Sequence, residues 1–304
     1  MNPEEFADKL GNLTDKEIDK FLSGIKSSQS GAYNKVVSLI KDLELTPDGT
    51  IKSNTNNLRI LNYVKIELEK QILTDSYKSR VNAYVNSFPK VKSINDKYFL
   101  DTIKEFNANK HAYSNLLKNS VQLTQNSLLE EGITTNVINP VKKIINDSIT
   151  ANWNFTDLVD NLRTNLKGTE QTLGSVERYA SQIATDALNQ FSANYNKSIS
   201  EDLNFEWYYY SGATRKTSRP FCEQYAGQYF HKKEIEDFGK GIDLNGNNLS
   251  NELEKGRIAG TNSSNIFTYR GGYNCKHQYL ATTISFVPQN VIDRNIEKGY
   301  YEAN

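Results

Sequence analysis

The periodicity of the sequence changes near residue 205, and this change limits the folds that the chain can adopt. Before it, apolar residues recur every three or four positions, which is the spacing of one face of a helix. From Phe205 the chain continues Phe-Glu-Trp-Tyr-Tyr-Tyr, an aromatic run typical of a β-strand. The sequence therefore predicts an α+β protein: a mostly helical N-terminal two thirds with long helices, followed by a small mixed α+β domain.

The helical part is expected to contain several long helices. Apolar stripes predict helices over residues 54–88, 96–129, 133–153, 158–166 and 176–199. Pro89 should stop the first of these, because proline lacks the backbone N–H and clashes with the preceding turn. Nearer the N-terminus, Thr14 and Glu17 form a capping box that predicts a pair of short helices over residues 2–25. The long helices suit either an extended arm that packs on neighbouring proteins or an ordinary helical bundle.

The part after residue 205 is expected to alternate short strands with turns and loops. Strands are predicted at residues 205–210, 228–231, 266–270 and 277–282, and a helical turn at 232–238. A segment rich in Gly, Asn and Ser predicts a mobile loop over residues 239–265, and residues 293–304 look like a frayed polar tail. The expected domain organisation is a helical arm or bundle at 1–130, a helical lead-in at 131–200, an α+β domain at 201–288 and a C-terminal tail at 289–304.

The composition argues against several classes of protein. The 304 residues include 36 Lys and Arg and 36 Asp and Glu, so no net charge would draw the chain onto nucleic acid. Two cysteines do not make a disulfide framework. The acidic N-terminus is unlike a signal peptide, and no apolar run approaches the roughly 18 residues that span a bilayer. We therefore expect a protein made in a reducing cytoplasm, with no membrane contact.

Both cysteines and two of the three histidines lie between Trp207 and His277. Because alternate residues of a strand share a face, Cys275 and His277 could point toward one spot. With Cys222 and His231 they could form a Cys2His2 or Cys2His zinc site, although the spacing is not that of a zinc finger. The alternative is that the cysteines are small buried groups and His277 is a hydrogen-bonded core residue. We expect no cofactor in that case, and a disulfide would be rare in cytoplasm.

Two further interpretations concern the same stretch. The segment 219–222 is expected to pack against residues 271–277, which would bring both thiols close to His277. Arg215 and Arg219 flank a short polar turn, where they could bind phosphate or a carboxylate. We favour a structural interpretation, in which ion pairs hold this turn against the loop that contains Gly271 and Gly272, called the glycine loop below.

The stretch resembles the C-terminal domain of the phage Mu F-like head morphogenesis proteins, also called minor capsid proteins. The resemblance covers about residues 130–285, including a helix at 176–186 that precedes the aromatic strand. It depends on the order and spacing of one set of residues, in which Lys276 departs mildly from the arginine common in the family. The matching residues are Arg215, Arg219, Pro220, Cys222, Gly227, Gly271, Gly272, Asn274, Cys275 and His277.

This resemblance implies a structural virion protein. Such a protein would act in procapsid assembly, at the portal vertex or in the capsid interior, after synthesis in the host cytoplasm. Its partners would be the portal protein, the major capsid protein or a scaffolding protein, and some relatives leave the head with the packaged DNA. The helical part would then carry partner binding. The alternative is a metal-dependent hydrolase or toxin-like enzyme that uses the Cys/His cluster, although the chain has no recognisable catalytic motif.

Overall fold

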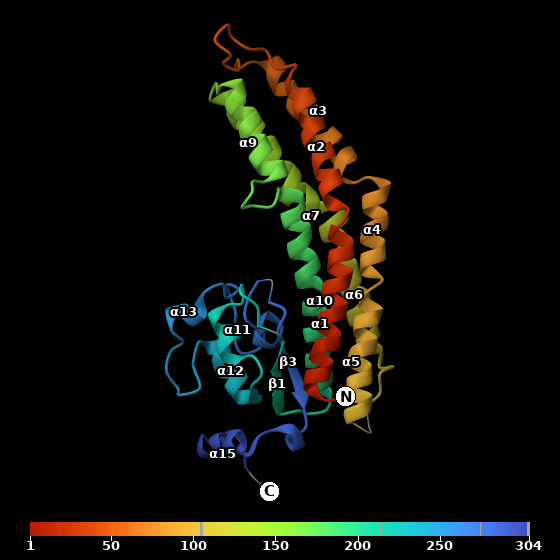
Figure 1. The fold of residues 1–304 in the computed structure, drawn as a ribbon, viewed down its shortest axis with the longest axis vertical. Helices are drawn as coiled ribbons and strands as arrows, with labels where there is room; N and C mark the ends of the chain where they lie inside the picture. Colours follow the sequence, from red (N-terminus) through yellow and green to blue (C-terminus); the bar gives the residue numbers. More distant parts are fainter. Residues whose placement is uncertain (104–105, 213, 274, 303–304) are drawn as a thin grey trace. The chain divides into compact units, whose positions relative to one another are not determined.

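The computed structural model describes residues 1–103, 106–212, 214–273 and 275–302, without the side chains of Ser27 and His111 (Figure 1). Before residue 205 the described chain is almost entirely helical. A small three-stranded antiparallel sheet follows it, so the predicted α+β class is confirmed.

The helices of the first 205 residues are ten α-helices and one π-helical turn, named η1, within the described part of the chain. Their bounds are α1 (Pro3–Leu22), α2 (Ile25–Ile40), α3 (Thr55–Ile72), α4 (Asp75–Val85), α5 (Phe88–Thr102), α6 (His111–Leu129), α7 (Glu131–Ile133), η1 (Thr134–Ile138), α8 (Asn139–Thr150), α9 (Phe155–Lys167) and α10 (Ser175–Asp202).

Several predicted helix boundaries are wrong. The helix predicted over 54–88 is two helices, because the Thr74 side chain caps α4 by accepting a hydrogen bond from the Tyr77 N–H. Pro89 begins α5 instead of ending a helix, which its missing N–H permits in a first turn. The helix predicted over 96–129 is likewise divided between α5 and α6.

The predicted capping box at Thr14 is also wrong. Thr14 lies inside α1, and its hydroxyl donates to the carbonyl of Gly11 at 3.0 Å, one turn back in the same helix. A threonine side chain can bond to the preceding turn as well as to a following N–H, so the pattern alone does not decide between the two.

The C-terminal part begins with the central strand of the sheet. The order is β2-β1-β3, with β1 (Trp207–Ser211) antiparallel to β2 (Tyr229–His231) and to β3 (Gln278–Thr282). All three strands lie at predicted positions. Short helices connect them and follow them: α11 (Pro220–Tyr225), α12 (Lys232–Lys240), α13 (Asn251–Glu254), α14 (Ile266–Tyr269), the 3-10 turn η2 (Ile284–Phe286) and α15 (Gln289–Glu297).

Two predictions for this part are wrong, the strand at 266–270 and the polar tail, and the loop expected at 239–265 is correct except for one short helix. The strand expected at 266–270 is the short helix α14, whose buried Ile266 and Phe267 do not alternate as strand residues do. The expected loop at 239–265 contains α13 and is tied back on itself, for example by the Arg257 guanidinium donating to the carbonyl of Thr261 at 3.4 Å. The expected polar tail forms α15, where Arg294 pairs with the buried Glu234.

Contacts divide the chain into two compact units, each assembled from separate stretches. One comprises Met1–Lys16, Ser87–Ser120 and Thr185–Asn304; the other comprises Glu17–Asn86 and Val121–Ala184. These boundaries differ from those expected after residues 130, 200 and 288, because helices α1, α6 and α10 each contribute to both units.

The second unit is a set of packed amphipathic helices. Helix α3 packs against α2 and α8, and α9 packs against α2 and α8. Their buried residues recur every fourth position, as the helical stripes predicted. Examples are Val64, Leu68 and Ile72 on α3, Val141, Ile145 and Ile149 on α8, and Leu158, Leu162 and Leu166 on α9.

The first unit holds the sheet. Strand β3 lies beside the C-terminal half of α10 (Figure 1), where the Ser192 hydroxyl donates to the Gln278 side chain at 2.9 Å. Tyr98 of α5 donates to the carbonyl of Ala281 at 3.0 Å. Both bonds are buried, so they fix β3 against helices that the sequence places far from it. Among the described residues, no helix is both long enough and apolar enough to cross a membrane.

Candidate functional site

Cys222, Cys275 and His277 meet inside the first unit, and each comes from a different local structure. Cys222 lies on α11, which starts with Pro220 in its first turn and Arg219 as its N-cap. Cys275 follows a turn in which its N–H donates to the carbonyl of Gly272. His277 directly precedes β3. The packing of segment 219–222 against residues 271–277 is therefore confirmed.

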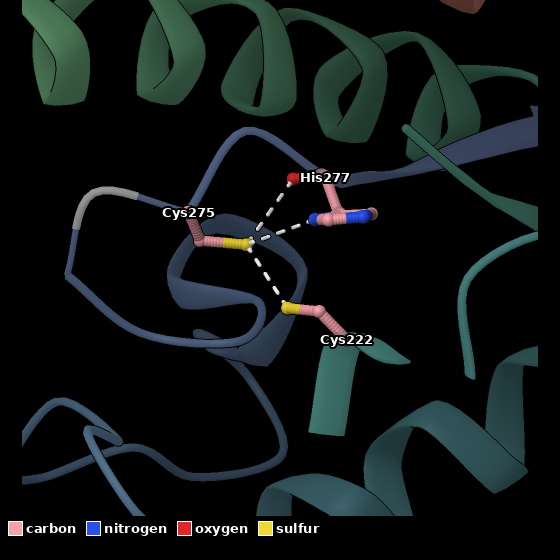
Figure 2. Close-up of side chains that lie close together, drawn as sticks. All are labelled: Cys222, Cys275 and His277. Atoms are coloured by element: carbon pink, nitrogen blue, oxygen red, sulfur yellow. Dashed lines mark hydrogen bonds between the residues drawn. The ribbon is translucent and has the colours of Figure 1, made fainter. Parts of the chain in front are cut away.

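The three side chains converge on one point (Figure 2). The two sulfurs are 3.7 Å apart, and Cys275 Sγ is 3.9 Å from His277 Nδ1. The three ligand atoms all lie within 4.8 Å of one another. The side chains are buried, since the residues are 3%, 6% and 4% exposed. These residues could hold one small soft metal ion, but a substrate could not reach the sulfurs without the core opening.

Tyr210 of β1 completes the surroundings of the cluster. Its hydroxyl lies 3.4 Å from Cys222 Sγ and 3.7 Å from Cys275 Sγ. Its ring stacks on the His277 imidazole, with centroids 5.4 Å apart. It also contacts the ring of Tyr279, its direct partner on β3. Sequence analysis missed Tyr210 as part of this site, although its place in an aromatic strand two positions before Gly212 was visible.

Glycines make room for the cluster. A Cβ atom on Gly271 would lie 2.3 Å from Cys222 Sγ, and one on Gly212 would lie 2.7 Å from the His277 ring. Gly272 has φ of +112°, and a Cβ there would lie 2.0 Å from the carbonyl oxygen of Gly256. Such a backbone conformation is essentially restricted to glycine. Gly271 therefore lets the backbone lie against the sulfurs, and Gly272 lets it lie against the backbone of Gly256.

The arginines of the motif have structural roles. Arg219 donates to the carbonyl of Gly271 at 2.8 Å and thereby ties α11 to the glycine loop. Arg215 and Lys276 both pair with Asp15 of α1. Burial alone would raise the pKa of Asp15, but the hydrogen bonds and charges of Lys276 and Arg215 lower it below its usual value. The favoured interpretation, ion pairs from both arginines to the glycine loop, is correct only in part: Arg219 reaches the loop through a carbonyl, and the ion pair of Arg215 is with α1.

The remaining motif and candidate residues lie elsewhere. Gly227 has φ of +80° in the turn before β2, where its N–H donates to the carbonyl of Tyr210. Asn274 lies outside the described residues. His231 caps α12, accepting a hydrogen bond from the Lys233 N–H on Nδ1, and its ring lies against Trp207. Within the described part of the chain, the group of candidate metal ligands does not include His231.

The buried groups around the sulfurs shift one another's acidity. The hydrogen bond between the two thiols lowers the pKa of Cys275 well below its ordinary value and raises that of Cys222, and His277 and Arg270 favour the Cys275 thiolate further. The two thiols therefore titrate as an interacting pair in which the thiolate is favoured at Cys275. Burial raises the pKa of Tyr210 and that of Tyr279 well above 10, so both phenols stay protonated at neutral pH.

Arg270 is the least expected residue near the site. It is 2% exposed, and none of its guanidinium nitrogens has a hydrogen-bond partner among the described residues. It also has φ of +52°, which is uncommon for a residue with a side chain. His277 Nε2 and the Tyr279 hydroxyl are likewise buried without a partner. Buried polar atoms normally have partners, so this part of the core is unusually polar.

No protein-family model matches the chain, and no curated protein or solved structure matches it either.

Proposed function

We propose that this chain is a structural protein of a phage head, a minor capsid protein that acts in procapsid assembly. It contacts the portal vertex or the capsid interior, with the portal, major capsid or scaffolding protein as partner, and it can leave the head with the DNA. The proposal rests on the resemblance to the Mu F-like head morphogenesis proteins. The observation that supports it most is the convergence of the motif residues Arg219, Cys222, Gly271, Cys275 and His277 on one buried cluster.

This convergence favours an assembly role over the metal-dependent hydrolase or toxin-like alternative. A nucleophile or a catalytic metal has to meet its substrate, and catalytic metal sites keep one open position. Here both sulfurs are buried. Gly271 lets backbone lie against these sulfurs, and Arg219 ties α11 to the loop that contains Gly271. Motif residues that hold a buried core together are what a stable, non-catalytic domain of an assembly protein requires.

The helical part offers a surface for a partner. Tyr63 and Ile66, one turn apart on α3, are 63% and 49% exposed. Neighbouring exposed apolar side chains of this size are a common feature of protein contact sites. We place the partner contact on this face of α3, within the part of the chain predicted to bind partners.

Co-expression with the portal protein encoded in the same genome tests the proposal. We expect the full chain to co-purify with the portal protein or with procapsids. The variant Tyr63→Lys/Ile66→Lys should lose this association while keeping its helical circular dichroism. Thr55→Lys/Asn62→Lys, which adds the same two charges at other exposed positions of α3, is the matched control. A wild-type chain that associates with neither portal nor procapsids would overturn the proposal.

A surface variant is a better test than removal of residues 1–130. Met1–Lys16 and Ser87–Ser120 belong to the same compact unit as the sheet, so a truncation would break that unit as well as any contact surface.

A further inference from the structure

The Cys222, Cys275 and His277 cluster has the dimensions of a tetrahedral metal site. Zinc binds thiolates at about 2.3 Å and imidazole nitrogen at about 2.0–2.1 Å, which places two sulfurs of a tetrahedral site about 3.8 Å apart and a sulfur and a nitrogen about 3.6 Å apart. The corresponding distances here are 3.7 Å between the sulfurs and 3.9 Å between Cys275 Sγ and His277 Nδ1. These two distances are within a few tenths of an ångström of the tetrahedral values, whereas the third, between Cys222 Sγ and the His277 nitrogen, is bounded only by the 4.8 Å within which all three ligand atoms lie, so an ion would draw these two residues together.

The distance between the sulfurs would also suit two hydrogen-bonded thiols without a metal. The orientation of the His277 imidazole therefore distinguishes a metal site from a thiol pair. His277 turns its Nδ1 toward the sulfurs, as Figure 2 shows, instead of toward a carbonyl or carboxylate. A thiol is a weak hydrogen-bond partner for a buried imidazole. A metal ion is a far stronger one, and two thiolates with one imidazole form a soft ligand set that suits zinc.

The unpartnered polar groups around the cluster are an independent observation. His277 Nε2, the Tyr279 hydroxyl and the whole guanidinium of Arg270 are buried without partners among the described residues. A buried, unpaired cation is costly unless negative charge lies near it. The thiolate is the form that binds metals, so a bound ion would place thiolate sulfurs in the same polar core as this guanidinium.

Tyr210 offers a candidate for the fourth ligand. Its hydroxyl oxygen is 3.4 Å from one sulfur and 3.7 Å from the other, close to the separation between the sulfurs themselves. An oxygen at these distances from both sulfurs is close enough to act as a further ligand of an ion held between them. Tyr210 is fully buried and so covers the cluster on this side, and a structural zinc site is likewise closed, with four ligands and no open position.

We propose that Cys222, Cys275 and His277 bind one structural zinc ion, with the hydroxyl of Tyr210 at the fourth position. The ion links α11, the glycine loop and the residue directly before β3. As far as the structure describes them, these three segments are not paired with one another as strands. It thereby does in a reducing compartment what a disulfide would do in an oxidising one. This proposal is independent of the assembly function, because a phage structural protein and an enzyme could both contain such an ion.

Metal analysis of the full-length chain tests the site. The protein is purified in a reducing buffer without chelator, and its zinc is measured by mass spectrometry. We expect one equivalent of zinc per chain. Replacement of that zinc by Co²⁺ should give visible bands of tetrahedral cobalt and a near-ultraviolet charge-transfer band from thiolate ligands. These two readouts need only the wild-type protein, so they remain informative if ligand variants fold poorly.

Matched variants then assign the ligands. Cys275→Ser and His277→Gln should each weaken zinc binding more than about 100-fold, since even outer-shell partners of metal ligands change affinity about 10–100-fold. Tyr210→Phe should weaken it by about 10–100-fold and leave the cobalt charge-transfer band in place. His231→Gln removes a buried histidine outside the cluster, which caps α12, and should leave zinc content unchanged.

Three results would overturn the proposal. The first is wild-type protein that contains no zinc after exposure to it and gives no thiolate charge-transfer band with cobalt. The second is zinc content that persists in the double variant Cys222→Ser/Cys275→Ser, which would mean that the metal binds elsewhere. The third is an intact mass showing a Cys222–Cys275 disulfide in protein isolated under reducing conditions.

Discussion

The helical unit of residues 17–86 and 121–184 and the segment from β1 to α15 are stabilised by different kinds of contact. The helical unit buries regular apolar stripes, and its buried polar links are few, such as the Tyr77 hydroxyl donating to the carbonyl of Leu128. The β1–α15 segment has short elements, glycines at positive φ and a core that contains thiols, an imidazole and a guanidinium. Many sequences can satisfy an apolar stripe, whereas a core of this second kind requires particular residues at particular positions.

Substitution of Gly272 should have the largest effect. Gly272→Ala places a Cβ at φ of +112° and 2.0 Å from the carbonyl oxygen of Gly256. We expect a loss of about 3–5 kcal/mol in the free energy of unfolding, because backbone strain of about 1–3 kcal/mol adds to the clash. Denaturant unfolding measures it, and Gly246→Ala, at positive φ in open space, is the control for strain alone. Equal losses in the two variants would contradict the close packing of Gly272 against the backbone of Gly256.

A truncation in the helical unit comes next. Leu68 is fully buried on α3, and Leu68→Ala should cost about 2–5 kcal/mol through lost burial and a cavity. Leu68→Met, which conserves volume, should cost less than about 1.5 kcal/mol. We expect this tolerance of volume-conserving changes in the helical unit and not in the polar core of the β1–α15 segment. A Leu68→Met variant as unstable as Leu68→Ala would show that the helical unit also needs specific side chains.

Glu234 tests the polar core near the C-terminus. Its carboxylate accepts hydrogen bonds from Arg294 at 2.8 and 2.9 Å and from Lys298 at 2.7 Å, which attaches α15 to α12. Glu234→Gln should cost about 2–3 kcal/mol, less than the 3–5 kcal/mol of a fully buried pair, because the two basic side chains are 28% and 25% exposed.

The same carboxylate predicts a dependence on pH. Burial would raise the pKa of Glu234, but Arg294 and Lys298 outweigh it and lower the pKa below the ordinary value. The stabilisation is therefore fully present above the pKa of an unfolded glutamate, about 4.3, and is lost as pH falls through the lower pKa of the folded state. Trp207 lies in the core cluster that contains Val291 of α15, so its fluorescence, measured in a Trp153→Phe background, reports this loss. The stability difference between wild type and Glu234→Gln should vanish in acid; a difference that persists there would contradict the ion pairs.

The smallest predicted effect is a gain. Gly31 lies inside α2, and a Cβ there meets only the end of the Gln71 side chain, at 3.5 Å. Gly31→Ala should stabilise the protein by about 0.5–1 kcal/mol, because alanine favours a helix over glycine. Thermal unfolding of Gly31→Ala, measured together with that of Gly272→Ala, gives the largest difference between the two regions. A destabilising Gly31→Ala would mean that helix packing is as restrictive as the glycine loop.

The sequence predicted the fold class, all three strands of the sheet and the approach of the two thiols to His277. It did so because helical and strand periodicities involve only neighbouring residues, and because the sequence contains only two thiols, which limits the ways in which they can pack together. The breaks at Thr74 and before α6 escaped prediction, since apolar stripes continue across a break when both helices face one core. Helix α15 escaped because its docking depends on Glu234, which lies 60 residues earlier. Tyr210 and Arg270 escaped because their places beside the sulfurs depend on strand pairing and on a backbone turn that no local pattern specifies.

The central claim is that the Cys/His cluster is a closed structural core and not a reactive site, and the reactivity of its two thiols tests this most directly. Full-length protein is mixed with a chromogenic disulfide reagent, with and without denaturant. The account predicts that both thiols of the native protein react slowly, at a rate set by opening of the core, and that two equivalents react at once after unfolding. A native protein in which one cysteine reacts as fast as in the unfolded chain would contradict the account and would favour a catalytic cysteine.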